Sequence, residues 1–204
     1  MSGVNLFLRA RRSAAVALIA TATGILIWLC GPIAISLHPT DSALNRVSAM
    51  LPVAPAILLT ASLNTPLAAK ERLSGRNLET LRLSHTLIQS TIIITLCSLG
   101  SWQLPPGDQG MVSTSRNAAA LIGSSLLGNA ILGPRIGWLI SLAWVIIPPL
   151  LIPRPYLDPS QLFTLISQPD DSFHAFIYAI VIWILGISAA SKEWSLELTR
   201  ISLH

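Results

Sequence analysis

The stretch that decides the fold class is Ser13–Leu37, SAAVALIATATGILIWLCGPIAISL, which contains no Asp, Glu, Lys or Arg. A helix rises about 1.5 Å per residue, so about 20 apolar residues cross the hydrocarbon core of a bilayer, which is roughly 30 Å thick. The stretch therefore predicts a membrane-spanning helix. Its apolar run is much longer than the roughly 7–15 residues of a signal peptide, so we expect it to remain in the mature protein.

Five further runs with few or no charges follow the first one. They cover residues 47–69, 83–107, 117–134, 136–153 and 172–191. The fourth and fifth are divided only by the turn Gly133-Pro134-Arg135 and could form one bent hairpin inside the membrane. Together they span about 37 residues, which is too long for one helix, so two spans are predicted. The sequence thus predicts an all-α fold, a single transmembrane domain over residues 1–204 with six transmembrane helices.

The composition agrees with lipid as the main solvent. Of the 204 residues, 52% are hydrophobic and only 11% are charged, whereas a soluble domain carries about 25% charged residues. Disordered chains combine low hydrophobicity with high charge, so the same figures exclude them. The net charge of +4 follows the ends of the apolar runs, which is a membrane-topology pattern and not a nucleic-acid-binding one.

The distribution of basic residues predicts the orientation, because Lys and Arg gather in cytoplasmic loops. With the N-terminus in the cytoplasm, the thirteen basic residues divide into ten inside and three outside. The inner ones are Arg9, Arg11, Arg12, Lys70, Arg72, Arg76, Arg82, Arg135, Lys192 and Arg200, and the outer ones are Arg46, Arg116 and Arg154. Both termini are therefore predicted to be cytoplasmic in a multi-pass protein of the cell membrane, of bacterial inner-membrane type.

Several functional classes need residues that this sequence lacks. It has no G-x-x-x-x-G-K-[ST] phosphate loop, no H-E-x-x-H, and no His, Cys, Asp and Glu at metal-ligand spacing. Gly123-Ser124-Ser125 is the nearest approach to a nucleophile motif, and small residues in such a helix more often form a close-packing face. We expect no catalytic residue, no metal and no cofactor. The predicted spans hold almost no ionisable group, which argues against an ion-coupled transporter.

The longest cytoplasmic connection, the predicted coupling loop 70–82, is the most informative loop. Asn77 is a good helix N-cap, and Leu78 and Leu81 form a short apolar stripe behind it. Glu79 and Arg82 lie three residues apart on one face. The pattern predicts a short amphipathic helix lying under the membrane.

The order Glu71-Arg72-x-x-Gly75-x-x-x-Glu79-x-Leu81 resembles the E-R-x-x-G-T-x-E-x-L segment of ABC-2-type transporter permeases. Arg76 stands where Thr is usual, and one extra residue precedes Glu79. In that family the segment forms the coupling helix that docks into the ATPase subunit. The resemblance therefore implies an ATPase-coupling role for this segment, through Glu71, Arg72, Gly75, Arg76, Leu78, Glu79, Leu81 and Arg82. The stretch Arg116–Gly123 is also similar to small actinobacterial permease-like proteins.

Residues 158–167 predict a second short helix, on the outer side. Asp158 suits the N-cap and Pro159 the first helical position. Leu162, Phe163 and Ile166 would then form its apolar face. The ABC-2 family places short, partly re-entrant helices here that help to close the substrate path, so the resemblance implies an outer gate.

The leading functional hypothesis is the membrane-spanning permease subunit of an ATP-driven exporter for an amphipathic, peptide-like or lipid-like cargo. It implies an ABC ATPase on a separate chain and a second permease copy or a homologous permease as partners in the bilayer, with no nucleic acid. Hydroxyl side chains such as Thr21, Thr23, Ser48, Thr60 and Ser62 would line an apolar path. The alternatives are a membrane scaffold, such as an immunity or assembly factor, and a membrane enzyme.

Overall fold

A computed structural model of the chain describes residues 13–35, 45–64, 78–104, 110–151 and 162–191. The helices are α2 (Ser13–Cys30), α3 (Val47–Met50), α4 (Val53–Leu63), α6 (Leu78–Gly100), α7 (Met111–Leu132), α8 (Leu139–Leu151), the 3-10 helix η2 (Leu162–Ser167) and α9 (Phe173–Ser191). A two-residue antiparallel ladder joins β1 (Ala34–Ile35) to β2 (Asn45–Arg46). The predicted all-α fold is confirmed for these residues.

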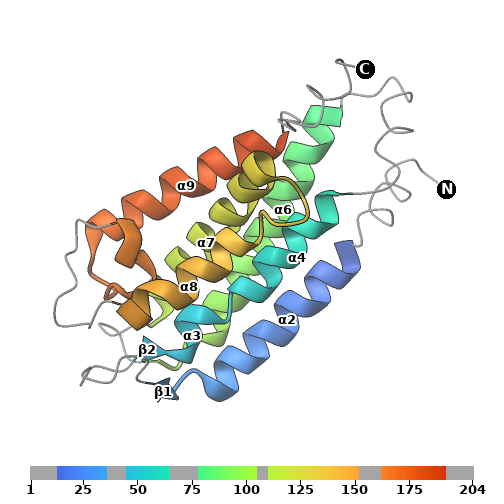
Figure 1. Ribbon diagram of the computed structural model, residues 1–204. Coiled ribbons are helices and arrows are strands. Elements are labelled where there is room, and N and C mark those ends of the chain that lie inside the picture. The colour runs from blue at the N-terminus through green and yellow to red at the C-terminus, as the bar shows by residue number, and fades with distance from the viewer. Residues whose placement is uncertain (1–12, 36–44, 65–77, 105–109, 152–161, 192–204) are drawn as a thin grey trace.

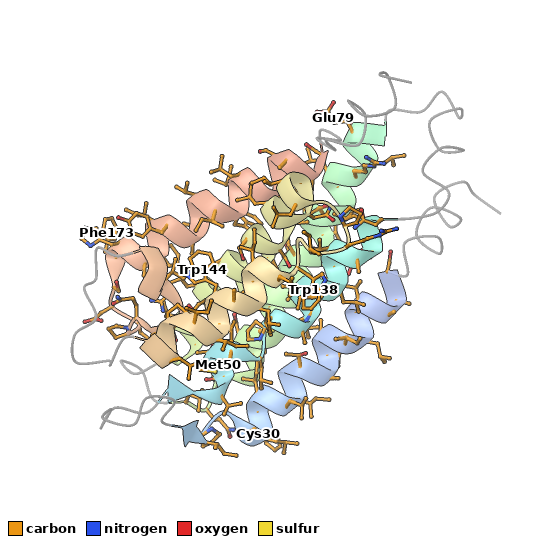
Figure 2. All side chains as sticks on the ribbon, viewed as in Figure 1. Cys30, Met50, Glu79, Trp138, Trp144 and Phe173 are labelled. Atoms are coloured by element: carbon orange, nitrogen blue, oxygen red, sulfur yellow. The ribbon has the colours of Figure 1, made fainter. Side chains whose placement is uncertain are left out.

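The helices lie side by side in one bundle (Figure 1). Within the described ranges the chain runs along the bundle as α2, α3 with α4, α6, α7, α8 and α9, each in the opposite direction to the one before (Figure 1). We call the end where α2 begins and α9 ends the proximal end. The other, distal end holds Cys30 and Phe173 (Figure 2). As a result of the alternation, α2 is parallel to α6, and α4, α7 and α9 are parallel to one another.

Three of the described helices are long and apolar enough to cross a membrane, namely Ser13–Cys30, Glu79–Gly100 and Phe173–Ser191. Two shorter apolar helical stretches, Val47–Leu63 and Leu139–Pro148, accompany them. Large apolar side chains are exposed on the outside of the bundle, for example Leu18 on α2 at 71% and Phe173 on α9 at 69%. Soluble proteins rarely expose broad apolar surfaces. These helices are those of a membrane protein.

Glycine contacts bring two pairs of parallel helices together. A Cβ at Gly100 of α6 would meet the Gly24 carbonyl oxygen of α2 at 2.3 Å, and one at Gly186 of α9 would meet the Gly123 carbonyl oxygen of α7 at 2.4 Å. Only glycine permits such close backbone approach, which is how helices associate where lipid removes the hydrophobic drive. Gly123 therefore lies on a close-packing face, as the sequence predicted.

The helix boundaries differ from the predicted spans where glycine and proline intervene. The first helix ends at Cys30 and not at Leu37, because Gly31 and Pro32 follow. The second is broken into α3 and α4 at Pro52, which cannot donate a backbone hydrogen bond. The third ends at Gly100, and the last, at 173–191, matches its prediction closely. Residues 36–37, 65–69, 105–107 and 152–153 of the predicted spans lie outside the described residues.

The predicted short helix under the membrane is wrong as a separate element. Leu78–Arg82 form the first turns of α6, which continues without a break to Gly100. Extending an existing helix adds a hydrogen bond for each residue that is fixed, whereas a separate helix must meet the cost of a new nucleus. No Pro or Gly between Leu78 and Leu99 interrupts this extension.

The position of Arg116 is a second correction. The sequence predicted it in an outer loop before a span at 117–134, but α7 begins at Met111, and Arg116 lies in its second turn. Its side chain is only 2% exposed. The predicted absence of charge inside the bundle is therefore wrong for this residue.

Candidate functional site

The most densely hydrogen-bonded part of the described structure lies at the distal end of α7. Arg116 donates from Nη1 to the Pro169 carbonyl at 2.8 Å, and from Nη2 to the carbonyls of Gln168 at 2.7 Å and Leu165 at 3.2 Å. These carbonyls belong to the last turn of η2 and the segment just after it, and two of them, Leu165 and Pro169, also accept backbone N–H groups at 3.3 Å. The planar guanidinium carries enough donors to bind all three at once.

Asn117 and Asp170 complete this arrangement. Asn117 accepts from Arg116 Nε at 3.2 Å and donates from Nδ2 to the Ile166 carbonyl at 2.9 Å. Asp170 Oδ1 accepts from the backbone N–H of Gly110 and of Ser113, both at 3.0 Å. We call the side chains of Arg116, Asn117 and Asp170, with the backbone they bind, the distal clasp.

The clasp supplies hydrogen-bond partners to the N–H groups at the start of α7 and to carbonyls at the end of η2. The N-cap position of α7 is Gly110, which has no side chain to cap the helix, and the carboxylate of Asp170, 60 residues further along the chain, takes that place. A negative charge there also favours the helix dipole. Arg116 and Asp170 interact electrostatically as well. The clasp thus fixes residues 165–170 against α7 by polar contacts from both segments.

Little in the sequence indicated the clasp. Arg116 was assigned to an outer loop because the charge-free run begins at residue 117, and the hydroxyl residues Ser113 and Thr114 stand just before it. Ser113 and Thr114 instead bond the Gly110 carbonyl, at 3.1 and 2.8 Å, inside the first turn of α7. The available signal was the Arg-Asn pair, since two adjacent multi-donor side chains at the start of a helix suit a carbonyl-rich partner.

The predicted outer gate falls partly on this clasp. η2 places Ile166 in the main hydrophobic core at 1% exposure, next to Leu165, which was not predicted and is fully buried. Leu162 and Phe163 belong to η2, and residues 158–161 of the predicted helix lie outside the described residues. The short helix exists as a 3-10 helix, in which every third side chain lies on one face.

The predicted coupling residues lie at or beyond the proximal start of α6. Glu71, Arg72, Gly75 and Arg76 lie outside the described residues, and Leu78 is the first residue of α6. Glu79 is exposed at the proximal end, opposite Phe173 (Figure 2), and Leu81 and Arg82 are half-buried. The structure therefore joins the described part of this segment rigidly to a helix of the bundle.

Further polar side chains join neighbouring helices of the bundle. Ser124 of α7 and Ser141 of α8 share a hydrogen bond of 2.7 Å, and Asn64 after α4 donates to Asn129 Oδ1 of α7 at 3.0 Å. Of the hydroxyls predicted to line a path, Thr23, Ser48, Thr60 and Ser62 are buried and Thr21 is exposed.

Chemically, the buried and partly buried polar groups of the described residues include hydroxyls, amides, the Arg116 guanidinium, the Asp170 carboxylate and the His85 imidazole. Cys30 and Cys97 are both free thiols. The described ranges contain no group of three His, Cys, Asp or Glu residues that could hold a metal ion. These groups can form hydrogen bonds and hold backbone segments in place.

The fold defines the class as an all-helical bundle with the apolar helices of a membrane protein. No family model matches the chain, and neither the curated proteins nor the solved structures gave a match. Function therefore has to be argued from the bundle itself.

Proposed function

We propose that this chain is the membrane-spanning permease subunit of an ATP-driven exporter, with its ATPase on a separate chain. The observation that carries the proposal is the path of the chain. The chain runs six times along the bundle, and both the beginning of α2 and the end of α9 lie at the proximal end (Figure 1). Between α8 and α9, η2 packs into the distal end. That order agrees with the ABC-2 resemblance of the Glu71–Leu81 segment.

The proximal end would face the cytoplasm. With Arg116 counted as an interior residue, the outer loops keep only Arg46 and Arg154 of the thirteen basic residues, against ten inside. The basic bias that orients membrane proteins is therefore larger than the sequence alone indicated. The exposed apolar faces of α2 and α9 would contact lipid.

The start of α6 would receive the ATPase. Glu79 and Leu81 lie on the first turns of a helix of 23 residues, directly after the Glu71–Arg76 part of the motif. Because α6 is continuous and contacts α2 at Gly24 and Gly100, a push on its proximal end would move both helices together. A second permease copy or a homologous permease would complete the path for an amphipathic, peptide-like or lipid-like cargo.

Retention of the ATPase tests the proposal. The permease is purified in mild detergent with an ABC ATPase supplied on a separate chain, as wild type and as Leu81→Asp or Glu79→Ala. We expect Leu81→Asp to abolish retention and Glu79→Ala to reduce it, because truncating one member of a desolvated charge pair costs about 2–5 kcal/mol. Asp171→Ala is the matched control, since Asp171 is an exposed carboxylate at the distal end.

Equal ATPase retention by all four proteins, with normal export, would contradict the proposal. The scaffold hypothesis would then lead, and one observation favours it: the exposed face of α2 includes Trp28 at 54%. Aromatic side chains of this kind anchor helix–helix interfaces as well as membrane boundaries.

A further inference from the structure

A side-chain hydrogen bond between Asn64 and Asn129 shows which residues of α4 and α7 lie opposite each other. Asn64 Nδ2 bonds Asn129 Oδ1 at 3.0 Å, and the two helices run in the same direction (Figure 1). Residues four apart lie on one helix face, so one turn further toward the distal end Thr60 of α4 stands level with Ser125 of α7. We call Thr60, Asn64, Ser125 and Asn129 the α4–α7 seam.

The seam changes from polar and open to apolar and closed along its length. Asn64 is exposed and Asn129 half-buried, whereas Thr60 and Ser125 are 3% and 0% exposed. Beyond them toward the distal end, α4 buries Ala56 and Leu59, and α7 buries Ala118, Leu121 and Ile122. The neighbouring buried hydroxyl of Ser124 bonds Ser141 of α8. The polar part of the seam therefore begins at the proximal end and stops at Ser125.

The Ser125 hydroxyl has no hydrogen-bond partner among the described residues. Helical hydroxyls usually donate to the carbonyl three or four residues earlier, as Thr60 does to Ala56 at 3.1 Å. For Ser125 the residue four earlier is Leu121, whose carbonyl lies 3.1 Å from the Ser124 hydroxyl and 3.0 Å from the Ser141 hydroxyl. These two hydroxyls also bond each other at 2.7 Å, so one of them donates to the other and one donates to the Leu121 carbonyl. That donor and the backbone N–H of the helix together occupy the two lone pairs of the oxygen.

A buried hydroxyl without a partner is costly, and proteins normally supply water or a ligand to such a group. Polar atoms inside membrane bundles commonly mark the path of a substrate. We propose that the α4–α7 seam is a hydrated entry from the proximal end, and that Ser125 at its floor binds an uncharged hydroxyl or amide group. All four seam side chains are neutral, so a charged group would find no counter-charge among them. The cargo as the source of that group rests on the proposed function, whereas the hydrated entry does not.

The test measures thiol alkylation in purified protein whose native cysteines are replaced by Cys30→Ala and Cys97→Ala. Asn64→Cys probes the mouth of the seam, and the nearly isosteric Ser125→Cys probes its floor. Ala118→Cys is the matched control, because Ala118 is equally buried and lies seven residues away on the same face of α7. Iodoacetamide carries an amide and iodoacetate a carboxylate of nearly the same size.

We expect iodoacetamide to modify position 125 at least about tenfold faster than position 118, because reaction requires access of the reagent to the thiol. The preference for iodoacetamide over iodoacetate should be larger at position 125 than at position 64. If Ala118→Cys does not fold, native Cys97, which is fully buried, replaces it as the control.

Equal rates at positions 125 and 118 would overturn the hydrated entry. Equal reagent preferences at positions 125 and 64 would overturn the assignment of an uncharged ligand. Neither result depends on an ATPase, so failure of this inference is distinguishable from failure of the retention experiment.

Discussion

At the scale of single residues, Arg116 dominates the distal end, because one guanidinium binds three carbonyls of another segment. We predict that Arg116→Ala lowers the free energy of unfolding by about 3 kcal/mol or more, since the variant loses three hydrogen bonds from a charged donor, and bonds of this kind contribute about 1.5–3 kcal/mol each. Arg116→Lys should recover little of this, because an ammonium cannot reproduce the planar fork. Equilibrium unfolding by SDS titration of the protein in micelles measures the change.

Arg135, exposed in the turn between α7 and α8, is the control for this prediction. Arg135→Ala removes the same charge and should change stability by less than about 0.5 kcal/mol. Equal losses for Arg116→Ala and Arg135→Ala would show that the clasp contributes nothing beyond a charge.

At the scale of helices, the pairing of α7 with α9 depends on the contact between Gly123 and Gly186. We predict that Gly186→Ala destabilises the bundle by about 1–3 kcal/mol, the usual cost of overpacking. The new Cβ would stand 2.4 Å from the backbone oxygen of Gly123, and backbone cannot rotate away as a flexible side chain can. The same SDS titration measures the loss of stability.

Ser188→Ala is the comparison for the glycine contact, because Ser188 is exposed on the same helix two residues later. It should leave the unfolding midpoint unchanged. A Gly186→Ala variant as stable as wild type would mean that α9 can shift away from α7 without cost.

At the scale of the whole molecule, the proposed orientation separates the two ends of the bundle across a membrane. Glu79 and Asp171 are both exposed and lie near opposite ends. In the cysteine-free background, we predict that an impermeant maleimide labels Asp171→Cys in intact cells, and Glu79→Cys only after the cells are permeabilised. The physical basis is the excess of basic residues at the proximal end.

Two results would contradict this orientation. Labelling of Glu79→Cys in intact cells would invert the protein and place the coupling segment outside, beyond the reach of ATP. Labelling of both positions from one side would show that the six runs of the chain do not each cross the bilayer.

The amino-acid sequence was sufficient for the all-helical class and for the approximate position of the three helices that are long and apolar enough to cross a membrane. Charge-free runs of about 20 residues bury their backbone only as helices in lipid, so the fold class depends on local composition. The helix boundaries differ from the predicted ones at Gly31, just after α2, and at Pro52, between α3 and α4. Both differences have a cause that is visible in the sequence, namely a glycine and a proline. The close-packing face at Gly123 was also predicted, because small residues in apolar helices have few other uses.

Only the tertiary structure decided what the polar residues do. Arg116 was assigned to a loop because a lone cation beside an apolar run is costly unless a partner offsets its burial, and its partners are carbonyls 49–53 residues away. The N-cap of α7 likewise comes from Asp170, and the Ser125 hydroxyl has no hydrogen-bond partner among the described residues. Hydrogen bonds between segments distant in sequence leave no local periodicity, whereas apolar burial does.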